Sequence, residues 1–348
     1  MKVLNLSYLD YAGVGLGYSK ATKRVGKYDS EFVTLYSHRY GYETDFTIYD
    51  GFISPHSYLS HLKSLTPPES KKCENQIVSN IKYVLDAISE SDIVHLVGDF
   101  PASTYINEGL YNIVDKPIIA TPGGSAFRRH FPIKKRISQA RWSIEEHKKN
   151  TTLRTVGTPD LNYPEFDAEW SPYAIDCLSV ENEWLTRNHD IPLISHSPSS
   201  RYAKSTDSLF IPAIEIIKKA GVKFEVDIIE NVSNKECIER KRNSTIFFDQ
   251  KGIGWYGIAA LEAAQYGIPS LAWIDQHSRN GLKPEDRDYK IISFEPTPEK
   301  LASLMISLIN SDLSEQSIMT KKWIDNVHSY EAVGKRLNNF YDKVLQGK

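Results

Sequence analysis

A glycine-bearing loop between an expected strand and an expected helix holds the residues best suited to chemistry. The apolar run Thr245–Phe248 predicts a strand, and Asp249 and Gln250 stand at its carboxyl end. Gly254 and Gly257 then allow a ligand to approach the backbone closely. Open α/β sheets bind ligands at the carboxyl ends of their strands, and the first N–H groups of a helix suit an anion such as a diphosphate.

Glu262 lies about one and a half turns inside the helix that we expect over Gly257–Tyr266. That depth is too great for a helix cap, and a carboxylate has the right polarity to accept hydrogen bonds from sugar hydroxyls. The alternative is a solvated carboxylate on the helix face, which composition alone favours. The residues alone do not decide between these two interpretations of Glu262.

Two cations follow the strand that we expect over Pro192–His196, at Arg201 and Lys204. Cations near the carboxyl end of a strand can clamp a diphosphate and neutralise the charge that develops when it departs. Ordinary surface charge on a loop is the alternative for each of them.

The first half of the chain opens with a strand expected over Met1–Ser7. A loop with Gly13, Gly15 and Gly17 follows it, and then a polar helical stretch over Tyr18–Val25. Many phosphate binders have a glycine-rich loop, so this loop alone is weak evidence for a site.

His95 lies in the apolar run Ile93–Val97, which predicts a buried strand. A lone histidine in such a strand is more often a satisfied core residue than a base. Proton transfer, or contact with an acceptor, is the alternative, because imidazole changes its charge near neutral pH.

The stretch Phe127–Trp142 holds six Arg or Lys residues, three aromatic residues and no acid. A charge run of this kind is usually a solvated face. It is also suited to anionic lipid headgroups, to a polyanionic glycan, or to nucleic-acid phosphates with bases stacked on Phe or Trp.

Strands and helical segments alternate along the chain, which predicts parallel sheets built from β-α-β units. In the first half we expect strands over Met1–Ser7, Glu31–Leu35, Ile93–Val97 and Pro117–Ala120, with a helix over Asn75–Ser89. In the second half we expect strands over Pro192–His196, Phe224–Ile229, Thr245–Phe248 and Ser270–Ile274, with helices over Ser208–Ala220, Asn234–Lys241 and Gly257–Tyr266. The pattern predicts two doubly wound α/β domains, residues 1–190 and 191–324. A last helix within 325–348 is expected to return to the first domain.

Composition excludes several classes of protein. The 348 residues suit two domains, and 42 Lys and Arg against 44 Asp and Glu exclude a globally basic nucleic-acid coat. No apolar run approaches the ~18 residues of a membrane span, and Asn5 and Asp10 interrupt the region where a signal peptide would be apolar. Three isolated cysteines lack metal-ligand spacing and suit a reducing compartment, so we expect a cytoplasmic protein, with peripheral membrane association through residues 127–142 as an option.

The segment around Glu262 resembles a known signature. It is similar to the nucleotide-sugar motif of retaining glycosyltransferases of the GT-B fold, the family 4-like group, which reads roughly Glu-Gly-Phe-Gly-x-x-x-Leu-Glu-Ala-x-Ala-x-Gly-x-Pro. The matching residues are Gly257, Leu261, Glu262, Ala263, Gly267 and Pro269. Glu262 falls on the second glutamate, which holds the ribose hydroxyls in that family. The first glutamate, which commonly contacts the transferred sugar, falls on Gly254, and this is a departure from the motif.

Other segments resemble the same family. His196–Asp207 is similar to its His-x-Pro-x-x-Arg-x-x-Lys-Gly-Thr-Asp variant, with Ser205 in place of the usual glycine and Arg201 offset from the more usual arginine position. Weaker likenesses lie in Tyr11–Gly17, Ser91–Leu96, Thr121–Arg128, Thr158–Leu161 and Trp170–Asp176.

The resemblance implies two Rossmann-like domains that face each other across a cleft. It implies a hexosyl- or pentosyltransferase that moves a sugar from a nucleotide-diphosphate sugar to an acceptor hydroxyl, with retention. The acceptor that we expect is a saccharide or a lipid-linked saccharide. We expect no cofactor beyond the donor and no essential metal, because no Asp-x-Asp stands in a metal-binding context.

The residues expected to act fall into three groups. Catalysis is assigned to Arg201, Lys204 and His95. Donor binding is assigned to Asp249, Gln250, Gly254, Trp255, Tyr256, Gly257 and Glu262. Acceptor binding is assigned to Gly13, Gly15, Gly124, Arg128 and Arg129.

Three alternative functions stay open. The first is a glycosyltransferase whose acceptor is DNA or RNA, an alternative that the basic stretch Phe127–Trp142 favours. The second is a nucleotide-sugar epimerase of the same architecture. The third is a non-catalytic protein that binds a sugar nucleotide or a glycan, for which Gly254 in place of glutamate is the best support.

Overall fold

The computed structural model describes residues 1–98, 113–124, 128, 144–188 and 190–347, and it divides into two compact units. Unit 1 comprises Met1–Gly157, Tyr163–Ala174 and Val333–Lys348, and unit 2 comprises Thr158–Asn162 and Ile175–Ala332. The division differs from the expected one in three places. Thr158–Asn162 and residues 175–190 belong to unit 2 rather than to the first domain, and the C-terminal segment of unit 1 begins at Val333 rather than at residue 325.

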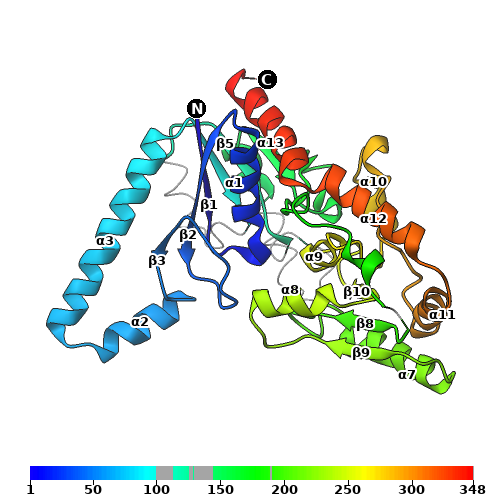
Figure 1. Cartoon of the computed structure of the whole chain (residues 1–348). Helices are drawn as coiled ribbons and strands as arrows, with labels where there is room; N and C mark the ends of the chain where they lie inside the picture. Colours follow the sequence, from blue (N-terminus) through cyan, green and yellow to red (C-terminus); the bar gives the residue numbers. More distant parts are fainter. Residues whose placement is uncertain (99–112, 125–127, 129–143, 189, 348) are drawn as a thin grey trace. The chain divides into compact units, whose positions relative to one another are not determined.

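The described strands of unit 1 form one parallel sheet in the order β3-β2-β1-β4-β5-β6-β7 (Figure 1). Their bounds are β1 (Lys2–Ser7), β2 (Asp29–Tyr36), β3 (Phe46–Tyr49), β4 (Ile93–Val97), β5 (Ile118–Thr121), β6 (Leu153–Val156) and β7 (Glu169–Trp170). From β1 the chain adds β2 and β3 on one side and β4 to β7 on the other. This reversal beside β1 makes the sheet doubly wound, as the alternating pattern predicts.

Three helices connect the first strands of unit 1. They are α1 (Val14–Val25), α2 (Pro55–Ser64) and α3 (Pro67–Glu90). α3 begins well before the expected Asn75, because Thr66 and Glu69 close its first turn: the Thr66 N–H and hydroxyl both donate to Glu69 Oε2, at 2.9 and 2.6 Å. The polar first turns of α3 carry no apolar stripe, so periodicity alone does not reveal them.

The glycines expected in a loop before Tyr18 lie partly inside α1, so that prediction is wrong for Gly15 and Gly17. A Cβ atom on Gly15 would lie 2.2 Å from the ring of Phe32, and one on Gly17 would lie 2.7 Å from the carbonyl oxygen of Ala174. These glycines let α1 pack closely within unit 1. Close packing therefore outweighs their low helix propensity.

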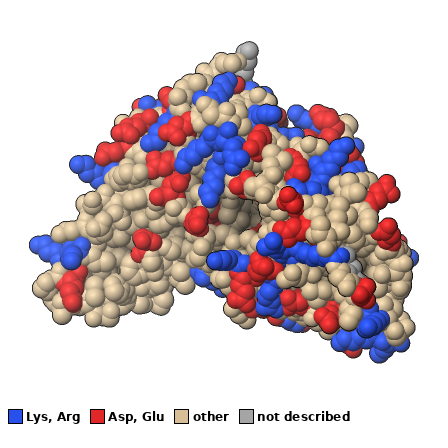
Figure 2. All heavy atoms as spheres, in the orientation of Figure 1, with Lys and Arg blue, Asp and Glu red and all other residues tan. Residues whose placement is uncertain are grey.

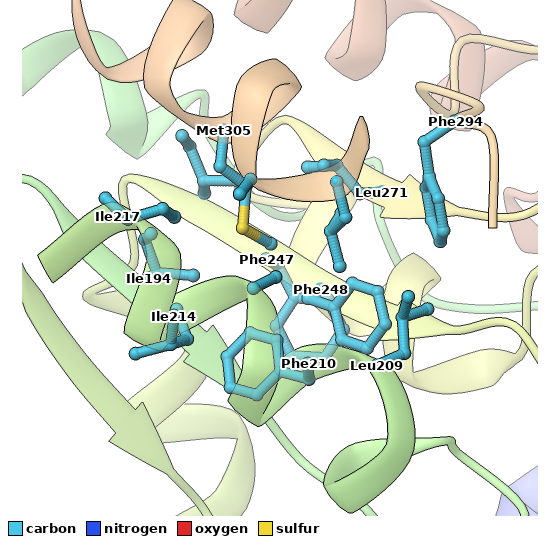
Figure 3. Packing of buried hydrophobic residues seen from close by; sticks show 14 of the residues in the cluster. Ile194, Leu209, Phe210, Ile214, Ile217, Phe247, Phe248, Leu271, Phe294 and Met305 are labelled. Carbon is cyan, nitrogen blue, oxygen red and sulfur yellow. The ribbon is translucent and has the colours of Figure 1, made fainter. Parts of the chain in front are cut away.

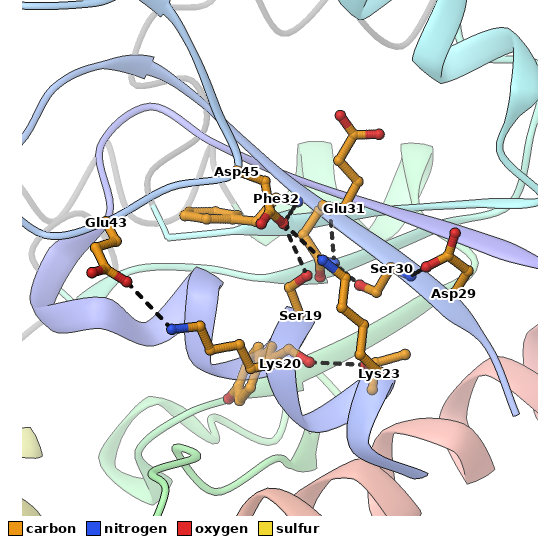
Figure 4. A network of polar contacts seen from close by, with 12 residues as sticks. Ser19, Lys20, Lys23, Asp29, Ser30, Glu31, Phe32, Glu43 and Asp45 are labelled. Carbon is orange, nitrogen blue, oxygen red and sulfur yellow. Dashed lines mark hydrogen bonds and ion pairs between the residues drawn. The ribbon is translucent and has the colours of Figure 1, made fainter. Parts of the chain in front are cut away.

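Asp45 holds α1 against β2 (Figure 4). Its Oδ2 accepts hydrogen bonds from the Phe32 N–H at 2.9 Å and from Lys23 Nζ at 3.2 Å. One carboxylate thus joins the backbone of a strand to a side chain of the helix that covers it, which fixes the helix that follows the glycine-bearing turn.

The last helix, α13 (Tyr330–Leu345), packs on α1 at very short range within unit 1. A Cβ atom on Gly334 would lie 2.1 Å from the carbonyl oxygen of Ala21. Further along α13, the buried hydroxyl of Tyr341 lies 3.4 Å from Thr22 Oγ1. The return of the C-terminal segment to unit 1 thus rests on backbone contact and on buried polar contact.

The single helix expected over residues 325–345 is two helices. α12 (Ser314–Val327) ends at His328, and α13 begins at Tyr330. The break has a local cause, because Ile175 pairs with Ser329 and its N–H donates to the His328 carbonyl oxygen at 2.8 Å. The backbone of Ile175 therefore bonds to the His328 carbonyl oxygen at the junction of α12 and α13.

Unit 2 holds a parallel sheet whose described strands run in the order β11-β10-β8-β9. The strands are β8 (Leu193–His196), β9 (Glu225–Ile228), β10 (Ile246–Gln250) and β11 (Ser270–Ala272). The helices and turns are η2 (Pro159–Leu161), η3 (Glu183–Thr186), η4 (Thr206–Phe210), α7 (Ile211–Lys219), α8 (Asn234–Arg242), α9 (Ile258–Ala264), α10 (Gln276–Asn280), η5 (Pro284–Asp286), α11 (Pro298–Ile309) and α12.

Strand β10 lies at the centre of the unit 2 core (Figure 3). Phe247 and Phe248 are fully buried among side chains from β8, η4, α7 and α11, including Phe210 of η4 and Met305 of α11. A strand buried on both faces reads as a continuous apolar run, which is why Thr245–Phe248 is recognisable in the sequence. This rigid strand carries the polar residues at its end.

Over the described ranges, none of the helices combines the length and the apolar character that crossing a membrane requires.

The short approach between α13 and α1 predicts that Gly334→Ala destabilises the protein. The added methyl group must displace the Ala21 carbonyl, which should lower the free energy of unfolding by about 1–3 kcal/mol despite the better helix propensity of Ala. Urea unfolding of the full chain measures this change. Asn339→Ala, on the exposed side of the same helix, is the matched control and should be neutral or slightly stabilising. Equal midpoints for both variants would contradict the packing argument.

Asp10 predicts a pH dependence of stability. Its buried carboxyl accepts hydrogen bonds from the N–H groups of Gly15 at 2.9 Å and Leu16 at 3.3 Å, yet burial raises its pKa to about 6. The folded state therefore holds the Asp10 proton more tightly than the unfolded state between about pH 4 and pH 6, so stability from this group falls as pH rises through that window. Asp10→Asn should reduce the loss of stability between pH 4 and pH 7 by up to about 3 kcal/mol.

Asp342→Asn is a control of opposite sign. Hydrogen bonds from Lys27 and Tyr28 lower the pKa of Asp342, so its contribution is present above the unfolded pKa and is lost as pH falls. Urea titrations at several pH values measure both effects. Parallel pH profiles for wild type and Asp10→Asn would rule out the shifted carboxyl.

Candidate functional site

The loops that follow β8 and β10 meet at the carboxyl end of the unit 2 sheet. The two strands are neighbours, with Phe248 paired to His196. A Cβ atom on Gly252, in the second loop, would lie 2.0 Å from the carbonyl oxygen of Ala203 in the first. Only glycine fits there, so the two loops are held against each other and their polar side chains are brought together.

Lys204 and Asp249 form an ion pair at this meeting point. Lys204 Nζ donates to Asp249 Oδ1 at 2.5 Å, and the side chains are 13% and 0% exposed. Asp249 Oδ2 accepts from the Gly257 N–H at 2.6 Å, and a Cβ atom on Gly257 would lie 3.3 Å from Lys204 Nζ and 3.4 Å from Gln250 Nε2. The structure thus brings four sequence-predicted residues together around the ammonium group of Lys204.

Trp255 and Tyr256 anchor the loop instead of facing out of it. Their side chains are 1% and 2% exposed. Trp255 packs on Tyr289 with ring centroids 5.1 Å apart, and the Tyr256 hydroxyl lies 3.1 Å from His328 Nε2. The burial leaves only their backbone groups for the donor contact expected of them.

Gly254 has a left-handed backbone and no room for a side chain. Its φ is +70°, and a Cβ atom would lie 2.3 Å from Asp275 Oδ2. The Asp275 N–H donates to the Gly254 carbonyl oxygen at 3.0 Å, and Asp275 Oδ1 caps α10 by accepting from the Ser278 N–H at 2.7 Å. Asp275 is absent from the sequence-based assignment, although its place just after the strand expected over Ser270–Ile274 was a usable signal.

Glu262 is buried and paired, so its interpretation as a solvated carboxylate is wrong. Its Oε2 forms an ion pair with Lys241 Nζ, and its Oε1 accepts from Asn234 Nδ2 at 3.2 Å. The side chains of Lys241 and Glu262 are 2% and 10% exposed. Burial alone would lower the pKa of Lys241, but the neighbouring Glu262 and Cys237 raise it above its ordinary value, so the lysine stays cationic.

Sequence reasoning missed Lys241 and Asn234. Lys241 stands between Arg240 and Arg242 near the end of α8, where a run of cations looks like an ordinary solvated helix end. The contact with Glu262 joins residues far apart in the sequence, so no local pattern reveals it.

Arg201 is engaged by two acids. Its guanidinium pairs with Asp207 at 2.5 Å and with Glu230 at 2.8 Å. Hydrogen bonding to Asp207, together with the charge of Glu230, raises the pKa of Arg201 further above its ordinary value. Because two carboxylates already neutralise this cation, its geometry supports a phosphate contact less well than that of Lys204.

His95 has the contacts of a structural histidine. It has no exposed surface, its Nε2 lies 2.7 Å from Thr121 Oγ1, and its Nδ1 lies 3.3 Å from the Tyr341 hydroxyl. Burial lowers its pKa to about 3, so the ring is neutral. Both ring nitrogens are occupied inside unit 1, which supports the core interpretation over the expected catalytic one.

The first two expected acceptor residues lie at the start of α1. Gly13 has a left-handed backbone with φ +73° and directly precedes the helix. Gly15 is buried inside α1 against Phe32, so packing explains this glycine without a ligand.

The other expected acceptor residues follow β5. The Arg128 guanidinium lies over Gly124, where a Cβ atom would come within 1.8 Å of Nη1, and the Arg128 N–H donates to the Gly124 carbonyl oxygen at 2.9 Å. Arg129 lies outside the described residues, as does the rest of Phe127–Trp142 apart from Arg128.

Charges of both signs are interspersed over unit 2 on the face that Figure 2 shows. Among the residues that the structure describes, no group of three or more His, Cys, Asp or Glu side chains is arranged to hold a metal ion.

No protein-family model matches the chain, and no curated protein matches its sequence. Among solved structures, HepE from Anabaena in complex with UDP and glucose has a TM-score of 0.62 at 10% identity, with 98% of this chain and 99% of that chain covered. Sucrose-phosphate synthase from Thermosynechococcus elongatus has a TM-score of 0.65 at 10% identity, with 100% of both chains covered. UDP-GlcNAc 2-epimerase from Neisseria meningitidis bound to UDP-GlcNAc has a TM-score of 0.54 at 12% identity, with 99% of this chain and 100% of that chain covered.

The fold class expected from the sequence is confirmed. Likeness at these identities shows the fold alone, and that fold is common to the transferases and to the epimerase. The chain has the α/β architecture of the GT-B fold, with one doubly wound Rossmann-like sheet in each unit.

Proposed function

We propose that the protein is a glycosyltransferase that uses a nucleotide-diphosphate sugar, bound by unit 2 through Lys204, the backbone of the 252–257 loop and Glu262. The observation that carries the proposal is the ammonium of Lys204, held by Asp249 beside Gly257 at the start of α9. Glu262 lies further along the same helix. HepE, which has the same fold, is also known in complex with UDP-glucose, and this supports a nucleotide-sugar donor.

Lys204 can contact a diphosphate without leaving Asp249. An ammonium group has three N–H donors, and Asp249 Oδ1 takes one of them. Two donors are then available to phosphate oxygens. Because the ion pair fixes the ammonium before the reaction, it can stabilise the departing diphosphate with little reorganisation.

We propose that unit 1 binds the acceptor, a saccharide or a lipid-linked saccharide, through residues near Gly13, Gly124 and Arg128. Retention of configuration and independence from a metal ion belong to the same proposal, in which Lys204 supplies the positive charge at the diphosphate. The three cysteines are free, which fits the reducing conditions of the cytoplasm that we propose as its location.

A nucleotide-sugar epimerase is the second candidate, because the Neisseria meningitidis epimerase has the same fold. The products distinguish the two. An epimerase converts the donor into a new nucleotide sugar without any acceptor. A transferase releases nucleoside diphosphate and forms a glycosylated product when the acceptor is supplied.

A thermal-shift panel of nucleotide sugars tests donor binding. A donor at 100 times its dissociation constant stabilises the folded protein by about 2.7 kcal/mol, so the correct donor should raise the melting temperature more than its free sugar does. If no nucleotide sugar in the panel raises the melting temperature, the proposed function is wrong.

We expect Lys204→Gln to reduce turnover more than it reduces donor affinity. The ammonium matters most as the diphosphate departs, so kcat should fall by about 10²–10³-fold, with a loss of donor affinity at least about tenfold smaller. Steady-state kinetics and donor binding by calorimetry give the two numbers. A melting curve must accompany them, because Asp249 then loses its cation while it stays buried.

Lys251→Gln is the matched control on the same loop. Lys251 Nζ donates to the Pro296 carbonyl oxygen at 3.4 Å, so it is engaged away from Asp249. Turnover and affinity should both stay close to wild type. A Lys204 variant that binds donor weakly but turns over normally would make Lys204 a binding residue only.

A further inference from the structure

Lys241 is a buried lysine without a part in the proposed reaction. Its side chain is 2% exposed, whereas lysine is among the residues least often fully buried. A buried lysine–carboxylate pair is weak evidence for stability, because well-packed apolar residues often replace such a pair at no cost. The pair with Glu262 therefore needs an explanation other than folding.

The surroundings of Lys241 fix the carboxylate of Glu262 at both oxygens. Lys241 Nζ donates to Oε2 and lies 5.4 Å from the ring centroid of Phe247, while Asn234 Nδ2 donates to Oε1 at 3.2 Å. Lys241 and Asn234 both belong to α8, one near each end. Helix α8 therefore supplies one hydrogen-bond donor to each oxygen of the carboxylate, which restricts its rotation.

Each oxygen of Glu262 keeps room for one more donor. A carboxylate offers about four lone-pair sites, and one on each oxygen is taken. The side chain is 10% exposed, so a ligand has access to it. The result is a rigid pair of adjacent acceptors, which matches two neighbouring hydroxyl groups, such as the 2′- and 3′-hydroxyls of a ribose.

We propose that Lys241, together with Asn234, is a positioning residue for Glu262, the residue that the family resemblance places at the ribose hydroxyls, and that the site loses its preference for ribonucleoside diphosphates over their 2′-deoxy counterparts when Lys241 is removed. The inference rests on the proposed function, since it takes the nucleotide of the donor to lie at Glu262. A 2′-deoxyribose fills only one of the two acceptor positions and leaves the other unpaired in a nearly dry site. Sites built to bind a hydroxyl discriminate strongly against the analogue that lacks it.

The test first measures the dissociation constants of UDP, GDP, ADP and CDP with the wild-type protein. The nucleotide that binds most tightly is then compared with its 2′-deoxy form. Wild type should prefer the ribonucleotide by about tenfold or more, the effect of a hydrogen bond to a charged group. In Lys241→Met the preference should fall below about threefold, through weaker ribonucleotide binding and with little change for the deoxynucleotide. Lys218→Met, which removes an exposed lysine that is also paired with a glutamate, should keep the full preference.

Two further variants guard against a folding defect. Asn234→Ala removes the donor to Oε1 without creating a lone buried charge, and it should reduce the ribose preference partially. Lys241→Met combined with Glu262→Gln removes both charges, and it should fold and show no ribose preference. Melting curves accompany each measurement.

The outcomes separate this inference from the proposed function. A full ribose preference in Lys241→Met, or in Asn234→Ala if the former does not fold, overturns the positioning role. An equal loss of affinity for ribonucleotide and deoxynucleotide also overturns it, because a merely structural lysine would act in that way. If wild type binds none of the nucleotides, the proposed function fails and this inference fails with it.

Discussion

Asp249 carries a carboxylate with no exposed surface at the end of the central strand β10, and the candidate site depends on how that charge is satisfied. A buried charge is costly unless it is paired and hydrogen-bonded. Asp249 has both kinds of partner, Lys204 from the loop after β8 and the Gly257 N–H at the start of α9. One carboxylate thus fixes the positions of two loops and of the cation between them. The close approach of Gly252 to Ala203 makes the same arrangement a steric requirement as well as an electrostatic one.

Each unit also contains a neutral histidine that joins a strand to its neighbours. His95 on β4 contacts Thr121 on β5 and Tyr341 on α13, and His196 on β8 contacts the Phe248 carbonyl of β10 and Thr206 of η4. Burial lowers the pKa of His95 to about 3 and that of His196 to about 4, so neither ring carries charge near neutral pH. A neutral imidazole can donate at one nitrogen and accept at the other, which suits it to link two polar groups in a dry interior. The two histidines therefore tie neighbouring parallel strands together, and proton transfer is not needed to explain them.

The sequence predicts the fold better than it predicts the site, and the reason is the range of the interactions. Alternation of apolar strands and helices is a local signal, so β4, β8 and β10 are found within a residue or two. The predicted start of α1 is wrong because Gly15 lies inside the helix, where the ring of Phe32 on strand β2 leaves no room for a side chain. No local sequence pattern shows this contact. The resemblance pointed to Lys204 and Glu262, but their partners had to come from the structure. Lys241 looks like a surface cation until the fold places it beside Glu262.

Gly254, where the sequence departs from the nucleotide-sugar motif, is matched by Asp275 from a neighbouring element. The resembling family has a glutamate at this position, whereas here the backbone is left-handed and the space for a side chain holds the carboxylate of Asp275. Asp275 follows β11, the neighbour of β10, and its N–H donates to the Gly254 carbonyl oxygen. An acid therefore still borders the loop, but it comes from the adjacent strand and is tied to the backbone of the loop. Restoring the glutamate at Gly254 alone would strain the backbone and collide with Asp275, so the glycine and the aspartate are best understood as one paired feature of this loop.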